Sequence, residues 1–171
     1  MKEFESFIRD IHDFPKPGVL FKDISPLLAN PKAMHDCTNA LYDLIGDERI
    51  DKVIGIESRG FFFATLLANK FDAGFIPVRK SGKLPYKTVA ESYELEYGNG
   101  ILEIHEDAIQ KGDRVVIHDD VLATGGTARA VCNLVEKLGG EIVQCNFLIE
   151  LVFLNGKEKI QEFPYAALFK Y

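Results

Sequence analysis

Residues 113–140 constrain the fold more than any other part of the sequence. The run "DRVVIHDD" is apolar until it ends in two adjacent acids, which is typical of a strand buried on both faces. A short turn, "VLATGGT", follows it, and the next residues carry an apolar stripe at helical spacing: Val131, Leu134, Val135 and Leu138. The stripe stops at Gly139 and Gly140, a common way for a helix to end. This segment therefore predicts one strand–loop–helix unit of an α/β protein.

The same alternation of short apolar runs and helical segments continues along the rest of the chain. Further strands are predicted over residues 52–57, 74–80 and 141–151, with a last edge element over 165–171, and further helices over residues 30–44 and 61–71. Strands alternating with helices predict a doubly wound, mostly parallel sheet, whose ligand site lies at the carboxyl ends of the strands. The polar residues from Ser81 to about Glu103 contain glycine and proline breakers, and they predict an exposed hairpin or a mobile loop.

Length and composition limit the classes of protein that this chain can be. Its 171 residues suit one domain, and a formal net charge of -6 provides no general basic surface for nucleic acid. No apolar run is long enough to span a membrane, and the mixed N-terminus argues against a signal peptide. The three cysteines, Cys37, Cys132 and Cys145, are widely spaced and are expected to be buried free thiols. We therefore expect a soluble cytoplasmic protein.

The turn after the acidic pair is suited to binding an anion. The backbone N–H groups of residues 123–127 can converge at the start of the following helix, where the helix dipole adds partial positive charge. Two glycines allow close approach, and two threonine hydroxyls can donate further hydrogen bonds; the five residues are Ala123, Thr124, Gly125, Gly126 and Thr127. The loop lacks the lysine of a Walker motif and the spacing of a dinucleotide motif. We interpret it as a phosphate-binding loop.

Asp119 and Asp120 cannot bind that phosphate themselves, because like charges repel. Carboxylates accept hydrogen bonds from sugar hydroxyls, so a ribose diol beside the phosphate would suit both acids. Side chains alternate along a strand, so both acids can serve one ligand only if the strand is ending there. The alternative is an acidic pair that merely caps or solvates the end of the strand.

The stretch "VVIHDDVLATGGTA" resembles the phosphoribosyl diphosphate (PRPP) motif of the type I phosphoribosyltransferases. Five other segments resemble the adenine-specific members of that family, in the expected order: "FPKPGVLFKDISPLL", "ESRGFFFA", "PVRKSGKLP", "ESYELEYG" and "LEIHEDAI". The match runs from about Phe14 to Glu150. Ala123 stands where members that act on oxopurines or orotate commonly carry an acid.

The resemblance implies transfer of the phosphoribosyl group of PRPP to adenine, giving AMP and diphosphate in purine salvage. It implies Mg2+ held by PRPP and water, with no metal ligand supplied directly by the protein. The fold implied is a single domain over residues 1–171, with a small N-terminal hood of about residues 1–30 and a mobile lid of about residues 81–103. The leaving diphosphate has to be stabilised, and the sugar passes through an oxocarbenium-like state.

The resemblance also assigns the diphosphate site. Arg59 is expected to donate to the diphosphate as a catalytic residue, and Ser58 to follow Glu57 through a cis peptide bond. Arg79, Lys80 and Lys83 would form the local basic cluster, and the equivalent of Arg79 can reach the diphosphate of a neighbouring subunit, which implies a homodimer. The other interpretations are a surface arginine at a helix start and an ordinary solvated run of charge.

In the lid, Glu96 is the expected general acid or base at the imidazole edge of the purine, with Tyr97 beside it. Ala123 cannot perform the role that an acid has at that position elsewhere in the family, which leaves the role open for Glu96. The alternative is a hairpin glutamate that faces solvent.

The segment "GVLFKD" is expected to form the base pocket. Phe21 would stack on the purine, and the backbone groups of Leu20 and Lys22 would read its edge. Phe21 could instead be a core anchor.

Two other functions remain open from the sequence. A transferase for hypoxanthine, guanine or xanthine would share most of these motifs. A regulator that binds PRPP without catalysis would share the fold, although it would need a nucleic-acid surface or a partner domain. His118 has no role assigned, and a satisfied strand histidine is one interpretation of it.

Overall fold

The computed structural model describes residues 3–94 and 99–171. The chain divides into two compact units, Met1–Ala40 and Leu41–Tyr171, with the boundary inside a helix. The elements of the first unit are η1 (Glu3–Phe7), β1 (Arg9–His12), β2 (Leu20–Asp23), α1 (Ser25–Ala29) and the first part of α2 (Pro31–Ile45). The expectation of a single domain with a hood over about residues 1–30 stays a prediction.

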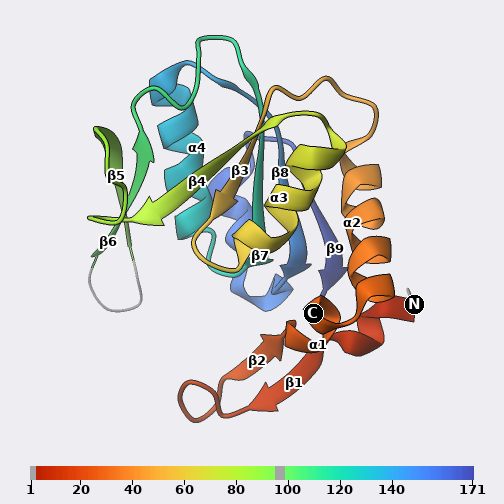
Figure 1. Ribbon diagram of the computed structural model, residues 1–171. Helices are drawn as coiled ribbons and strands as arrows, with labels where there is room; N and C mark the ends of the chain where they lie inside the picture. The colour runs from red at the N-terminus through yellow and green to blue at the C-terminus, as the bar shows by residue number, and fades with distance from the viewer. Residues whose placement is uncertain (1–2, 95–98) are drawn as a thin grey trace. The chain divides into compact units, whose positions relative to one another are not determined.

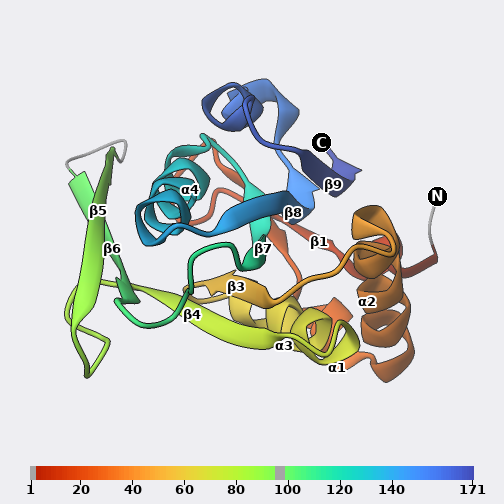
Figure 2. The same ribbon diagram turned by 90° about the horizontal axis from the view of Figure 1, so that it is seen from above.

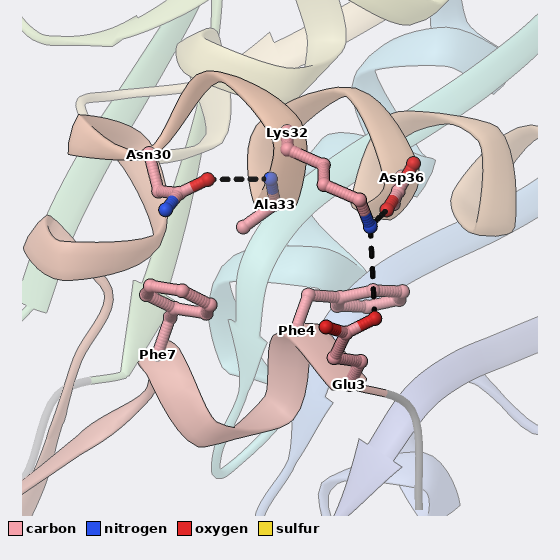
Figure 3. Close-up of a pocket in the computed structure, with 7 residues that line it drawn as sticks. All are labelled: Glu3, Phe4, Phe7, Asn30, Lys32, Ala33 and Asp36. Carbon is pink, nitrogen blue, oxygen red and sulfur yellow. Dashed lines mark hydrogen bonds and ion pairs between the residues drawn. The ribbon is translucent and has the colours of Figure 1, made fainter.

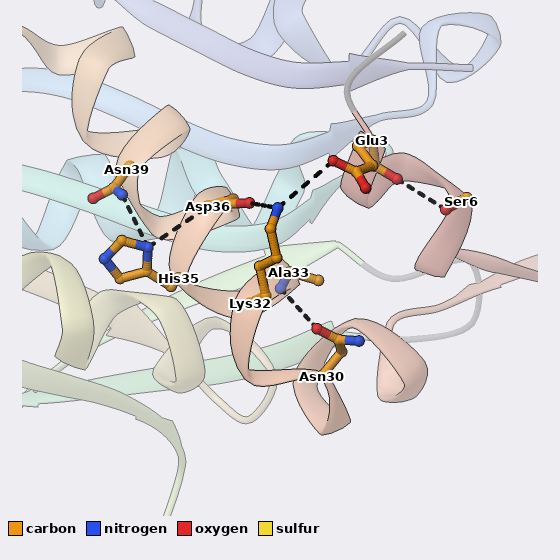
Figure 4. Close-up of polar contacts among 8 residues, drawn as sticks. All are labelled: Glu3, Ser6, Asn30, Lys32, Ala33, His35, Asp36 and Asn39. Carbon is orange, nitrogen blue, oxygen red and sulfur yellow. Dashed lines mark hydrogen bonds and ion pairs between the residues drawn. The ribbon is translucent and has the colours of Figure 1, made fainter.

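Helix α2 starts where the sequence predicts it. Asn30 Oδ1 accepts a hydrogen bond from the Ala33 backbone N–H at 2.9 Å, which caps the helix, and Pro31 occupies its first position. Phe4 and Phe7 of η1 line a pocket beside this helix start (Figure 3). The Lys32 ammonium lies between Asp36 and Glu3, at 2.7 and 3.6 Å from their carboxylate oxygens (Figure 4). These pairs are largely exposed, so each contributes little to stability.

The second unit is built on a seven-stranded sheet in the order β5-β6-β4-β3-β7-β8-β9 (Figure 1). Its strands are β3 (Lys52–Ile56), β4 (Gly74–Lys80), β5 (Thr88–Glu94), β6 (Asn99–His105), β7 (Arg114–Leu122), β8 (Glu141–Glu150) and β9 (Tyr165–Lys170). The strands from β4 to β9 in this order are parallel, whereas β6 runs antiparallel to β4 and to β5. The doubly wound, mostly parallel sheet expected from the sequence is confirmed.

Two helices cover opposite faces of this sheet (Figure 2). Helix α3 (Gly60–Lys70) connects β3 to β4, and α4 (Gly126–Leu138) connects β7 to β8 in the opposite direction along the sheet. Because such connections are right-handed, reversing their direction places the helices on different faces. The apolar stripe of α4 packs into the core as predicted, with Leu138 only partly buried. On α3 the side chains of Phe63 and Leu67 are inaccessible to solvent.

The structure refines three expectations about the chain. The polar residues 81–103 contain most of the β5–β6 hairpin, which extends the sheet. Strand β7 continues past the acidic pair to Leu122, so the expectation that the strand ends at Asp120 is wrong. The two carboxyl groups nevertheless lie close enough for each to shift the pKa of the other, so strand alternation does not separate them fully. Two 3-10 helices, η2 (Val152–Leu154) and η3 (Gly156–Ile160), precede β9 and were not predicted. The three cysteines are buried, as expected.

Within the described residues, the helices are all too short or too polar to cross a bilayer.

Candidate functional site

The candidate site lies where the sheet reverses its direction of winding. Strands β3 and β7 are parallel neighbours, with Ile54 opposite Ile117 and Gly55 opposite His118. From β3 the chain proceeds to β4 on one side, whereas the connection that leaves β7 leads to β8 on the other. The carboxyl ends of two such strands border a crevice that binds ligands in α/β proteins. The motif after β3 and the loop after β7 therefore reach the same edge of the sheet.

The loop of residues 123–127 has the geometry of an anion site. Gly125 adopts φ +77°, a left-handed conformation that favours glycine, and Gly126 begins α4. None of the five backbone N–H groups donates a hydrogen bond to a group in the described part of the chain. The loop lines a small pocket together with Asp119, Val121, Leu122 and Ala128. Unsatisfied amides at the start of a helix favour a phosphate or carboxylate ligand.

Gly156 supports this loop from behind, and the sequence analysis did not find it. A Cβ atom on Gly125 would lie 2.1 Å from the Gly156 carbonyl oxygen, and one on Gly156 would lie 2.1 Å from the Ala123 carbonyl oxygen. The two backbones are therefore in direct contact, and neither position has room for a side chain. The dipeptide Asn155-Gly156 is a turn signal, which indicates a bend but not its partner.

Asp119 and Asp120 lie beside the loop in different surroundings. Asp120 is buried, and its Oδ2 is 2.7 Å from the Nε of Arg59. Asp119 is half-buried, and its Oδ1 accepts the Asp120 backbone N–H at 2.9 Å. A Cβ atom on Gly60 would lie 2.8 Å from the same Asp119 oxygen, so the glycine lets the start of α3 approach β7 closely.

Both carboxyl groups have raised pKa values. Burial and the neighbouring Asp120 carboxylate raise the pKa of Asp119 well above its ordinary value. Burial also raises the pKa of Asp120, and the Arg59 guanidinium opposes that rise. A buried carboxylate beside a half-buried one is costly unless hydrogen-bond donors reach them. Hydroxyl groups of a sugar are donors of the required kind.

The residues after β3 provide the second part of the site. The Glu57–Ser58 peptide bond is cis, as the resemblance implied. Ser58 is exposed, and Arg59 directly precedes α3 with its side chain 32% exposed. Arg59 therefore lies between the acidic pair and solvent, with a firm partner in Asp120. It is not a freely solvated surface arginine.

The basic cluster predicted after β4 is anchored on Glu57. Glu57 Oε2 accepts the Lys80 backbone N–H at 3.0 Å and lies 3.4 Å from the Nε of Arg79. Its other oxygen pairs with the Lys83 ammonium. Burial by itself would raise the pKa of Glu57, but the hydrogen bonds from Lys83, Lys80 and Arg79 together lower it below its ordinary value. The structure thus brings Arg79, Lys80 and Lys83 together around one ionised carboxylate.

The residues expected to bind the base belong to the first unit. Leu20, Phe21 and Lys22 follow one another on β2, and the Phe21 ring packs edge-on against Phe14 at a centroid distance of 5.1 Å. Phe21 is half-buried, and the Lys22 ammonium is 2.7 Å from Asp10 Oδ1. The lid residues Glu96 and Tyr97 lie outside the described residues.

His118 is fully buried on β7, next to the acidic pair. Its Nδ1 lies 2.9 Å from Asn146 Oδ1, and the amide nitrogen of Asn146 donates to the Leu41 carbonyl at 3.2 Å. Burial lowers the pKa of His118 to about 4, and the hydrogen bond to Asn146 offsets only part of this effect. His118 is therefore neutral near pH 7 and is a satisfied strand histidine on one ring nitrogen, with Nε2 lacking a partner among the described residues.

Comparisons with known proteins agree with this geometry. The model of the phosphoribosyl transferase domain family matches residues 23–163. An adenine phosphoribosyltransferase of Flavobacterium johnsoniae is 63% identical over 169 residues, which cover 99% of each chain. The chain belongs to the adenine phosphoribosyltransferase family. Within that family, the crystal structure from Rhodothermus marinus is 51% identical with a TM-score of 0.94, covering 98% of this chain and 96% of that one.

A second adenine phosphoribosyltransferase structure shows a relative with ligands. The Saccharomyces cerevisiae enzyme is 39% identical with a TM-score of 0.93, covering 98% of this chain and 97% of that one. It was crystallised with adenine and an imino-altritol 1,6-bisphosphate. The phosphoribosyltransferase fold expected from the sequence is thus confirmed over nearly the whole chain.

Proposed function

We propose that this protein transfers the phosphoribosyl group of PRPP to adenine, giving AMP and diphosphate, as a purine salvage enzyme. The observation that carries the proposal is the pairing of a loop of unsatisfied amides with the buried Asp120 and half-buried Asp119 carboxylates at the switch point of the sheet. A phosphate and a diol of the same sugar phosphate suit the chemistry of these two adjacent groups. The complex of the yeast relative with adenine supports the choice of base.

Different groups of residues bind different parts of PRPP. In this proposal residues 123–127 bind the 5'-phosphate, and Asp119 and Asp120 accept hydrogen bonds from the ribose hydroxyls. Ser58, Arg59, Arg79, Lys80 and Lys83 bind the diphosphate. Donors already in position where the diphosphate gains charge stabilise the departure of the leaving group without reorganisation.

The base and the proton transfer are assigned to the remaining residues. Leu20 and Lys22 read the edge of adenine with backbone groups, and Phe21 stacks on the ring. The salt bridge of Lys22 with Asp10 supports a backbone role, because it engages the ammonium elsewhere. Glu96 exchanges a proton with the imidazole edge of the purine, and Tyr97 belongs to the same lid, whose closure would exclude water.

Mg2+ is the cofactor in this proposal, and it enters bound to PRPP. Residues 3–94 and 99–171 contain no group of three or more His, Cys, Asp or Glu side chains suited to a metal ion. Magnesium commonly keeps several waters and binds through substrate phosphates with few protein carboxylates. Asp119 and Asp120 are assigned to the ribose, so in this proposal PRPP and water hold the cation, without a ligand supplied directly by the protein. Such a cation would neutralise charge on the diphosphate.

We further propose that the enzyme is a cytoplasmic homodimer that acts on small molecules only. The net charge of -6 supports the absence of a nucleic-acid substrate. Sedimentation velocity of the full chain would test the dimer.

The test of the proposed function is an initial-rate assay with Mg2+, PRPP and a panel of bases. We expect AMP from adenine, with a kcat/KM roughly 10²-fold or more above the values for hypoxanthine, guanine and xanthine. Preference for an oxopurine would refute the adenine assignment. PRPP binding without any product from the panel would instead favour a regulatory protein.

A further inference from the structure

The Glu57 carboxylate is the point at which the basic cluster converges. Three donors from the end of β4 and the following turn reach it: the Lys80 backbone N–H, the Arg79 guanidinium and the Lys83 ammonium. The Glu57 side chain is 8% exposed, whereas those of Arg79 and Lys83 are 34% and 45% exposed. The Glu57 carboxylate is thus buried in the protein, whereas the side chains of Arg79 and Lys83 are more accessible to solvent.

The turn that carries the cations is held from two sides. Arg79 Nη1 donates to the Lys83 carbonyl at 3.3 Å, so the guanidinium closes the turn on itself. On the other side, Glu103 accepts hydrogen bonds from Ser81 Oγ at 2.6 Å and from the Gly82 backbone N–H at 3.0 Å. Glu103 stands opposite Arg79 in the β4–β6 ladder, but its carboxylate bonds to Ser81 and Gly82 and so shapes the same turn.

Two like charges gathered in one place require a counter-charge. Arg79 and Lys83 repel each other, and both have long, flexible side chains that lose entropy when they are fixed. The Glu57 carboxylate removes the repulsion, and its hydrogen bonds orient both groups. The lowered pKa of Glu57 keeps this carboxylate ionised at neutral pH. A polyanion that reaches the cluster then meets donors already in position, which reduces the cost of binding.

We propose that Glu57 is a positioning residue for diphosphate recognition: its carboxylate gathers Arg79, Lys83 and the Lys80 amide into the arrangement that receives the diphosphate of PRPP. The inference rests on the proposed function, because it assumes that the cluster binds diphosphate. The proposal thus places an acidic residue, Glu57, in a site whose other residues bind an anion. Glu57 does not itself contact the substrate, so it acts only through its three partners.

The test replaces Glu57 by glutamine, an isosteric side chain that can still accept the Lys80 N–H but carries no charge. We expect the Kd of magnesium diphosphate, measured by calorimetry, and the KM for PRPP to rise roughly tenfold. AMP affinity and the KM for adenine should stay within about twofold, because AMP lacks the diphosphate. The matched control is Glu103→Gln, which alters the same turn and should leave diphosphate affinity within about twofold of wild type.

Two results would overturn the proposal. Unchanged diphosphate affinity in Glu57→Gln would show that Glu57 merely ties β3 to β4. Tighter binding would show that the carboxylate competes with diphosphate. If the glutamine variant folds poorly, Glu57→Asp is the second variant, because it retains the charge but shortens the side chain by one methylene. This variant should also weaken diphosphate binding. Unchanged affinity in Glu57→Asp would likewise overturn the proposal. Diphosphate binding is measured without turnover, so a protein that makes no AMP would refute the proposed function while leaving this test readable.

Discussion

Replacement of His118 by leucine should change the pH dependence of stability in a defined direction. His118 is fully buried, and burial lowers its pKa to about 4 from the ordinary value of 6.5. Above pH 6.5 the imidazole is neutral in both the folded and the unfolded chain, so it contributes no pH dependence. As the pH falls from 6.5 toward 4, the unfolded chain takes up a proton that the folded chain resists, and stability is lost.

The size of the effect follows from the two pKa values. Each pKa unit corresponds to about 1.4 kcal/mol, so the full loss is roughly 3 kcal/mol below pH 4 and about 2 kcal/mol at pH 5. The leucine variant lacks this loss. It also leaves the buried Asn146 Oδ1 without its imidazole partner, which costs roughly 1–3 kcal/mol at every pH. This second cost is a constant offset between the two proteins.

Urea unfolding of both proteins at pH 7.5 and pH 5 separates the two effects. The difference in free energy of unfolding between variant and wild type should shift by about 2 kcal/mol in favour of the variant at pH 5. Carboxylate titrations common to both proteins cancel in this comparison. The control is His35→Leu, at a side chain that is 75% exposed. A difference for His118→Leu that stays constant from pH 7.5 to pH 5 would refute the reasoning.

Three further predictions concern the site. Glu96→Gln should lower kcat by roughly 10²-fold with PRPP affinity little changed, and near-normal turnover in a steady-state assay would reject a proton-transfer role. Asp119→Ala and Asp120→Ala should each weaken PRPP binding in calorimetry while adenine binding is retained; wild-type PRPP affinity in both variants would contradict the ribose assignment. Gly156→Ala should lower kcat/KM for PRPP by roughly 10²-fold, because the new Cβ would lie 2.1 Å from the Ala123 carbonyl oxygen and would displace the loop of residues 123–127. Gly74→Ala is the control for the last prediction, since the close contacts of its Cβ would be with the flexible Lys52 side chain and the Asp51 carbonyl would lie at an ordinary 3.8 Å. Unchanged kinetics in Gly156→Ala would reject the supporting role.

The sequence predicted best what depends on neighbouring residues. The apolar stripe of α4 and the start of α2 at Asn30 follow from local spacing, and the structure confirms them. Because parallel strands end at one edge of a sheet, local patterns also indicated that the residues after β3 and β7 lie at the same edge, but the ion pair of Arg59 with Asp120 was not predicted. The end of β7 was misplaced, since a run buried on both faces has no alternation that marks its last residue.

The sequence could not predict contacts between residues that are far apart in the chain, whether these are polar contacts or close backbone contacts. Nothing in the residues around Glu57 indicates that the cations following β4 converge on it, because the contact depends on the register between β3 and β4. The contact of Gly156 with Gly125 depends in the same way on how the chain returns after β8. Glu57 belongs to the segment "ESRGFFFA" but only its cis peptide bond was expected, and Gly156 belongs to no motif; each contacts residues that were expected to bind substrate. The motif residues identify the ligand, and the residues behind them decide whether its binding groups are held in position, so variants of Glu57 and Gly156 test the site more sharply than variants of the motif alone.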